Sequence, residues 1–183
     1  GVLLRVFSVG LLHWYLHGIV NGLEYIHSQG VMHLDIKPEN ILCTVDGRPK
    51  LADFGLSRTM EIGNRGRYQS GLSNNVPQGT LMYAAPEQLE RRPDRKSDIW
   101  ALGITCLTLL EGKPPFQDPT SYVQIVRHNI QYPDWLPGPL DSLIRAMLMI
   151  DVQNRICSSE ISLHDFSHSR FAKSRVCKPG FSK

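Results

Sequence analysis

The chain has 183 residues, of which 42% are hydrophobic and 20% charged, and a formal net charge of +3. This is ordinary globular composition with enough chain to bury one core, so we expect one domain or a large part of one. The four cysteines are far apart and form no C-x-x-C pair, which argues against a disulfide framework or a cysteine-rich zinc site. The longest apolar run, residues 99–110, is too short to span a bilayer.

The first predicted element is a long helix that starts at a capping residue, Ser8, and runs to about Ser28. Apolar residues recur at helical spacing and give this helix one apolar face: Leu12, Tyr15, Leu16, Ile19, Leu23 and Ile26. A short extended segment follows at 31–34. Two short strands are predicted at 40–44 and 50–52, joined by a turn at Asp46-Gly47.

The second half of the chain is predicted to be mostly helical. Residues 56–82 are polar and without periodicity, which is typical of a functional loop. A helix resumes at 86–89, and the apolar segment 98–111 predicts a buried helix. Three shorter helices are expected at 119–129, 140–148 and 159–166. Residues 167–183 are rich in Ser, Lys and Arg, so we expect a basic, flexible tail. This order of elements fits no doubly wound sheet.

Four motifs occur in a fixed order along the chain. They read H-x-D-I-K-P-E-N at 33–40, D-F-G at 53–55, G-T-x-x-Y-x-A-P-E at 79–87 and S-D-I-W-A-L-G at 97–103. Together they resemble the motifs of protein kinases of the serine/threonine type, over about residues 8–166. By that resemblance, residues 33–40 are the catalytic loop and residues 53–55 the magnesium loop.

The resemblance implies a mainly α fold, the C-terminal lobe of a protein kinase, with a small two-stranded β element at these two loops. It implies five catalytic residues: Asp35, Lys37, Asn40, Asp53 and Thr80. Asp35 would accept the proton of the attacking hydroxyl, and Lys37 would contact the transferring phosphoryl group. Asn40 and Asp53 would hold Mg²⁺, which prefers oxygen ligands. Thr80 would contact Asp35 and Lys37, and Leu42 would form the floor under the adenine of ATP.

The same resemblance assigns architectural roles to other residues. His33 and Phe54 are expected to stack in the core beside the long helix. Asp98 is expected to accept hydrogen bonds from the catalytic-loop backbone. Glu87 and Arg155 are expected to form a buried ion pair.

The catalytic loop departs from the family pattern at one position. Leu34 stands where the family often has an arginine that pairs with a phosphorylated activation loop. Leucine cannot make a charge-assisted hydrogen bond. We therefore predict that activation does not use a phosphate–arginine contact, although Ser57, Thr59 and Tyr68 lie in the 56–82 loop as candidate phosphorylation sites, with Ser70 and Ser73.

The sequence has no G-x-G-x-x-G loop, and Lys50 and Lys173 follow the catalytic loop, where the strand lysine of a kinase would precede it. The apolar start of the chain lacks a basic n-region, so we interpret it as an interrupted chain and not as a signal peptide. We expect residues 1–166 to be the C-terminal lobe alone, with one wall of the nucleotide pocket. Because catalysis of phosphoryl transfer is mostly positioning and charge stabilisation, we expect this chain in isolation to be weakly active or inactive.

Two functions remain open. One is part of a serine/threonine kinase that uses ATP and Mg²⁺ and phosphorylates a protein substrate. The other is a catalytically inactive module that binds proteins through its helical surface. No nucleic-acid or membrane partner is expected, because the basic residues at 91–96 are more typical of a solvated turn. We expect an intracellular, cytoplasmic protein; its oligomeric state is not determined by the sequence.

Overall fold

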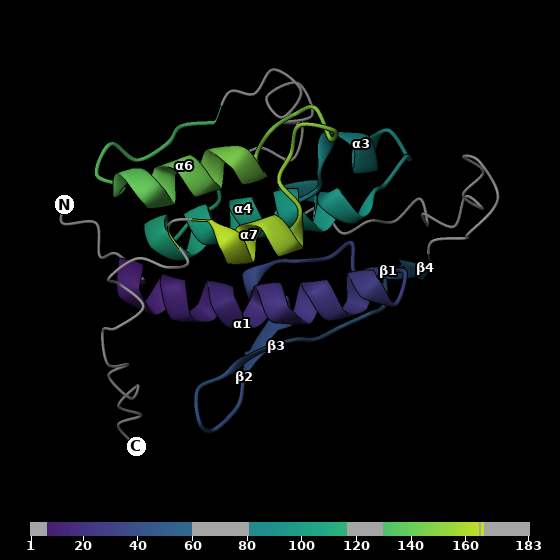
Figure 1. Cartoon of the computed structure of the whole chain (residues 1–183), viewed down its shortest axis with the longest axis horizontal. Helices are drawn as coiled ribbons and strands as arrows, with labels where there is room; N and C mark the ends of the chain where they lie inside the picture. Colours follow the sequence, from purple (N-terminus) through teal and green to yellow (C-terminus); the bar gives the residue numbers. More distant parts are fainter. Residues whose placement is uncertain (1–6, 60–80, 117–129, 165, 167–183) are drawn as a thin grey trace.

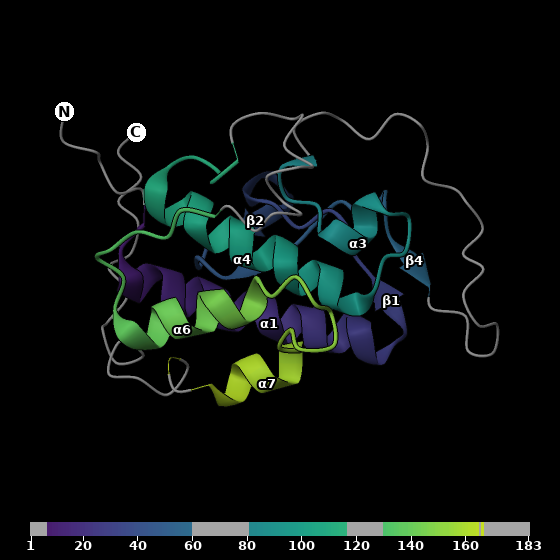
Figure 2. The same cartoon turned by 90° about the horizontal axis from the view of Figure 1, so that it is seen from above.

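The structure is a computed structural model, and it describes residues 7–59, 81–116, 130–164 and 166. Its described part is mainly helical, with two small two-stranded sheets at one side. Helices α1, α4 and α6 run side by side, and α7 packs against α1 (Figures 1 and 2). The predicted mainly α lobe with a small β element is confirmed.

Helix α1 (Val9–Ser28) begins where the sequence predicts, because the Ser8 side chain accepts a hydrogen bond from the Leu11 amide. Its buried face packs on α4, α7 and β3. Gly18 lies so close to β3 that an added Cβ would come within 2.6 Å of the Pro49 side chain. A glycine at this position therefore allows the helix and the small sheet to pack closely.

The first small sheet joins β2 (Ile41–Cys43) and β3 (Pro49–Leu51) as an antiparallel hairpin. Both strands differ slightly from the prediction. Asn40 belongs to the short 3₁₀ helix η1 (Pro38–Asn40), Thr44 belongs to the turn, and β3 begins and ends one residue earlier than expected. The turn contains Gly47, whose φ of 82° a glycine adopts without strain.

The second small sheet pairs β1 (Val31–Met32) with β4 (Arg58–Thr59) in antiparallel fashion. Strand β4 lies within the segment that was predicted to be a loop. Two residues are too few to show an alternating pattern, so this strand has no signal in the sequence. The pairing holds the chain that leaves the magnesium loop against the entry to the catalytic loop.

Helix α4 (Arg95–Glu111) is the centre of the core, and most of its residues are buried. It begins three residues before the predicted start, because Asp94 caps it by accepting a hydrogen bond from the Lys96 amide. It ends at Gly112, whose φ of 75° is the left-handed conformation common after helices. The predicted burial of this helix is confirmed.

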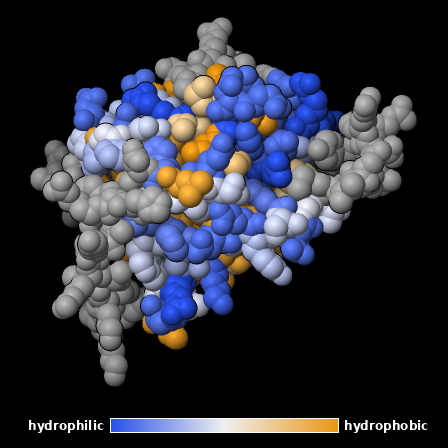
Figure 3. Space-filling model, viewed as in Figure 1, coloured by the Kyte–Doolittle hydropathy of each residue, from blue (hydrophilic) through white to orange (hydrophobic). Residues whose placement is uncertain are grey.

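The remaining described helices are α3 (Pro86–Leu89), α6 (Gly138–Met147) and α7 (Ser158–Leu163). Helix α7 is shorter than predicted because His164 adopts an extended conformation. The helix predicted at 119–129 and the tail predicted at 167–183 lie outside the described residues. On the face seen in Figure 3, hydrophobic side chains occur as small patches among hydrophilic ones. Within the described part, no helix combines the length and apolar character that crossing a membrane requires.

Candidate active site

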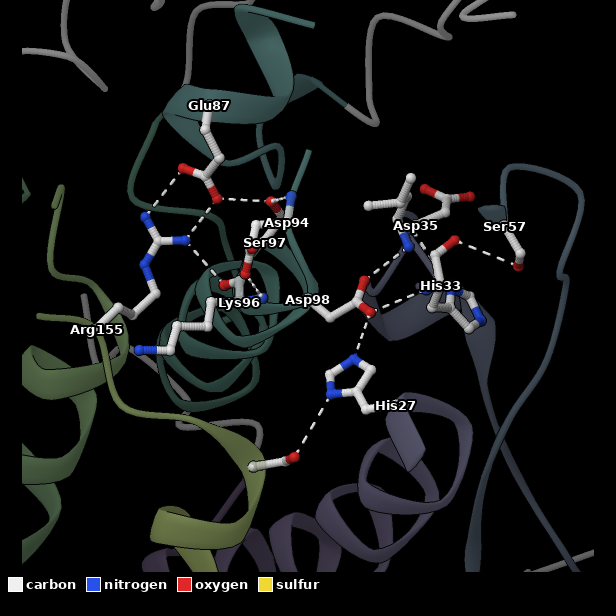
Figure 4. A network of polar contacts seen from close by, with 12 residues as sticks. His27, His33, Asp35, Ser57, Glu87, Asp94, Lys96, Ser97, Asp98 and Arg155 are labelled. Carbon is white, nitrogen blue, oxygen red and sulfur yellow. Dashed lines mark hydrogen bonds and ion pairs between the residues drawn. The ribbon is translucent and has the colours of Figure 1, made fainter. Parts of the chain in front are cut away.

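The backbone of the catalytic loop is fixed by one buried carboxylate, that of Asp98 on α4. Asp98 Oδ1 accepts the Leu34 amide at 2.7 Å, and Oδ2 accepts the His33 amide at 2.9 Å. Figure 4 shows these contacts together with His27, whose Nε2 lies 2.8 Å from Asp98 Oδ2. The predicted role of Asp98 is confirmed.

His27 was not anticipated from the sequence. It lies on the buried face of α1, four residues after Leu23, and its Nδ1 is 3.5 Å from the Ser158 hydroxyl of α7. A histidine at an apolar position of a helical pattern was the available signal. A buried histidine at such a position needs a hydrogen-bond partner on the element that packs against this face.

Two further side chains lie at backbone carbonyls of the catalytic loop. Gln88 on α3 donates from Nε2 to the Leu34 carbonyl at 2.9 Å. The Thr105 hydroxyl on α4 lies 3.5 Å from the Ile36 carbonyl, while its shorter hydrogen bond, at 2.8 Å, goes to the Ala101 carbonyl of its own helix. Sequence reasoning missed both contacts. Each is a polar residue in an otherwise apolar helical stretch, but only the fold reveals which carbonyl it faces.

The side chains of Asp35, Lys37 and Asn40 come together as the motif predicts. Asp35 Oδ2 accepts hydrogen bonds from Lys37 Nζ at 2.9 Å and from Asn40 Nδ2 at 2.7 Å. Asn40 Nδ2 also donates to the Asp35 carbonyl at 2.9 Å. Asp35 Oδ1 is buried and has no hydrogen-bond partner among the described residues. A buried carboxylate oxygen without a donor is costly unless it receives one from a bound molecule.

Asp53 is held near this cluster because the backbone of the preceding residue, Ala52, contacts the catalytic loop. The Ala52 amide donates to the Asn40 carbonyl at 2.9 Å, and His33 Nε2 lies 3.1 Å from the Ala52 carbonyl. Asp53 itself is exposed, has a φ of 59°, and accepts the Gly55 amide at 3.1 Å. The catalytic and magnesium loops are thus joined by one backbone hydrogen bond and by one contact of the His33 side chain.

The donor set at these loops fits a magnesium ion. Among the residues that the structure describes, both hydrogen bonds of the Asn40 side chain use Nδ2, which leaves its carbonyl oxygen available for a cation. Asp53 adds an exposed carboxylate. Mg²⁺ is commonly bound by one or two such protein oxygens together with waters and substrate phosphates.

Leu42, which the resemblance predicts to lie under the adenine, and Phe54 are both at the surface. Leu42 is 58% exposed on β2, and Phe54 is 46% exposed. The predicted contact between the rings of His33 and Phe54 is confirmed at a centroid distance of 4.7 Å, and His33 is buried. The prediction that Phe54 itself lies in the core is wrong, because its side chain is at the surface. The prediction for Thr80 lies outside the described residues.

The predicted ion pair between Glu87 and Arg155 is confirmed. Arg155 Nη1 and Nη2 donate to the two carboxylate oxygens of Glu87 at 2.7 and 3.1 Å. Arg155 also donates to the carbonyls of Lys96 and Met149, each at 2.8 Å, and Ser97 donates to Glu87 at 2.6 Å. Figure 4 shows how this network connects α3 to the start of α4.

Tyr83 is buried shortly before α3. Burial raises the pKa of the Tyr83 hydroxyl, and a hydrogen bond with Thr108 partly opposes that rise. The phenol is therefore neutral at physiological pH and acts here as a packed, hydrogen-bonding group.

Residues 4–167 match the protein kinase domain. The chain belongs to the protein kinase family. The described elements correspond to the mainly helical C-terminal lobe of a protein kinase domain.

Several curated serine/threonine kinases are similar to this kinase chain. Serine/threonine-protein kinase AtPK2/AtPK19 of Arabidopsis thaliana is 32% identical over 92% of the chain and 35% of that protein. A cAMP-dependent protein kinase, catalytic subunit-like, of Caenorhabditis briggsae is 36% identical over 83% of the chain and 38% of that protein. CBL-interacting serine/threonine-protein kinase 5 of Arabidopsis thaliana is 36% identical over 85% of the chain and 36% of that protein. The kinase chain thus spans little more than a third of each relative.

Proposed function

We propose that this chain is part of a serine/threonine kinase that transfers the γ-phosphoryl group of ATP to serine or threonine hydroxyls of a protein substrate. The observation that carries the proposal is the state of the Asp35 carboxylate. One oxygen is held by Lys37 and Asn40, and the other is buried without a donor among the described residues. A substrate hydroxyl would supply that donor.

In this proposal Asp35 orients the hydroxyl and accepts its proton as the phosphoryl group is transferred. The oxygen held by Lys37 and Asn40 fixes the rotation of the carboxylate, so its free oxygen keeps one direction. Lys37 places a positive charge beside the transferring group. Because both donors come from the same loop, the geometry is set before the substrate binds.

The kinase family uses ATP and Mg²⁺. When bound, Mg²⁺ would neutralise charge on the phosphates of ATP. Asn40 would offer its carbonyl oxygen and Asp53 its carboxylate. The exposed Leu42 side chain would contact the adenine. These three assignments, together with those of Asp35, Lys37 and Thr80, are proposals for this chain.

The test uses the whole kinase of which this chain is a part. It measures transfer from γ-labelled ATP to two degenerate peptide libraries, one with a fixed Ser/Thr and one with a fixed Tyr. We expect transfer to the first library only. Asp35→Asn should lower kcat by about 10²–10⁴, the usual contribution of a positioned general base. Asp46→Asn, an exposed turn carboxylate, is the matched control and should keep the original rate. A full rate in Asp35→Asn contradicts the proposal.

A second candidate is a protein-binding module without catalysis. The exposed apolar side chains of Leu42 and Phe54 favour it, since exposed apolar surface next to a polar cluster is typical of a binding face. Titration with ATP separates the candidates. Binding of ATP that requires Mg²⁺ and is lost in Asp53→Ala supports the kinase, whereas capture of a protein partner unaffected by Asp53→Ala supports the module.

A further inference from the structure

The residue before the proposed catalytic base has an unusual backbone conformation. Leu34 is buried and has a φ of 64°. A bulky residue rarely adopts a positive φ, because its Cβ approaches the following carbonyl oxygen. Such a conformation persists only where the surroundings impose it. The direction in which Asp35 leaves the backbone depends on this conformation.

Both peptide groups of Leu34 are held by side chains from distant parts of the sequence. Its amide donates to Asp98 Oδ1 on α4 at 2.7 Å, and its carbonyl accepts from Gln88 Nε2 on α3 at 2.9 Å. Gln88 is only 8% exposed. One contact fixes the amide of Leu34 and the other fixes its carbonyl, so together they define the backbone conformation of this residue.

We propose that Gln88 is a positioning residue that keeps Leu34 in this conformation and thereby aims the Asp35 carboxylate at the substrate. The inference rests on the proposed function, because it assigns a role within that reaction. Gln88 also joins α3 to the catalytic loop by a hydrogen bond between two neutral groups. This connection does not require a phosphorylated residue.

The surroundings make Gln88 suited to this role. Its neighbour Glu87 is fixed by the ion pair with Arg155 and by Ser97, so α3 provides a rigid base. Rigid support around a polar side chain is what holds a reacting group in place. The Leu34 side chain has no charge to pair with an anion, so the loop is held through its backbone.

The test is Gln88→Met, which keeps the length of the side chain and removes its donor. Gln29→Met is the matched control, because Gln29 is exposed and its side chain donates only to the Ser28 hydroxyl among the described residues. We expect Gln88→Met to lower kcat by about 10- to 100-fold, the scale of a small misplacement of a reacting group. The KM for ATP should stay unchanged, and amide exchange at residues 33–35 should accelerate. Gln29→Met should change none of these.

Unchanged kcat and unchanged amide exchange in Gln88→Met would overturn the proposal. So would a rise in KM at constant kcat, because that pattern belongs to binding and not to positioning. If the variant does not fold, NMR of the unmodified chain decides. A nuclear Overhauser contact between the Gln88 side-chain amide and the Leu34 α proton supports the contact, and its absence overturns it. No transfer by the unmodified protein would count against the proposed function, while exchange at residues 33–35 would still test the Gln88 contact.

Discussion

The Leu34 amide and the Asp98 carboxylate are joined by a 2.7 Å hydrogen bond between residues 64 positions apart in the sequence. The same carboxylate accepts the His33 amide and lies 2.8 Å from His27 Nε2. One buried side chain of α4 therefore sets the backbone of the proposed catalytic loop. The loop has its shape because the core holds it, and not because of its own local preferences.

Asp98→Asn should destabilise the protein by about 2–3 kcal/mol, because it replaces a charged acceptor of buried hydrogen bonds and turns an N–H donor toward other donors. Urea unfolding followed by circular dichroism measures this change. Asp134→Asn is the control, since Asp134 is exposed. Equal unfolding midpoints for the two variants would contradict the role given to Asp98.

Removal of one partner of the Glu87–Arg155 pair should cost about 3–5 kcal/mol, because the other charge stays buried. Glu87→Gln, Arg155→Met and the double variant form a double-mutant cycle, measured by chemical denaturation. The exposed pair Asp141–Arg145, at 2.8 Å, is the control and should contribute less than about 1 kcal/mol. A loss of activity in Glu87→Gln would therefore follow from the loss of stability and would not identify Glu87 as a catalytic residue.

Simultaneous replacement of the loop hydroxyls by alanine should leave turnover nearly unchanged. The residues are Ser57, Thr59, Tyr68, Ser70 and Ser73. Leu34 offers no charge for a phosphorylated side chain, so phosphate on these residues has no partner at that position. Steady-state kinetics of the fivefold variant and of phosphatase-treated protein provide the measurement. A large fall in kcat would contradict this prediction.

Cys106 should resist alkylation in the folded protein. It is buried on α4, and burial raises the pKa of its thiol to about 12, so almost no thiolate exists at pH 8. A variant with Ser at positions 43, 157 and 177 leaves Cys106 as the single thiol. Its reaction with iodoacetamide at pH 8 should be slow in buffer and fast in urea. The raised pKa also predicts that stability falls as pH rises above about 8.5, where the unfolded thiol ionises.

Much of the fold could be predicted because its signals are local. Ser8 followed by an apolar face predicts α1. The ion pair of Glu87 with Arg155, 68 residues further on, is not a local signal and was expected from the family resemblance alone. The cluster of Asp35, Lys37 and Asn40 lies within six residues, so a short motif brings the three side chains together. The functional roles of these residues remain predictions.

The parts that could not be predicted depend on contacts between distant segments. Nothing near His27 indicates Asp98 as its partner, and nothing near Gln88 indicates the Leu34 carbonyl. Phe54 resembles a core residue by its chemistry, but its exposure depends on what packs around the magnesium loop. Asp94 follows a proline within a charged stretch, so its capping role is hidden by the signal for a turn.

The distance in sequence between Leu34 and Asp98 also has a consequence during protein synthesis. Residue 98 is added 64 residues after residue 34, which takes about 3–13 s at typical rates of translation. For that time the nascent chain can form α1, but the amides of His33 and Leu34 have no acceptor from α4. The catalytic loop therefore takes its shape late on the ribosome. Its contact through His27 to Ser158, 131 residues from His27, forms later still.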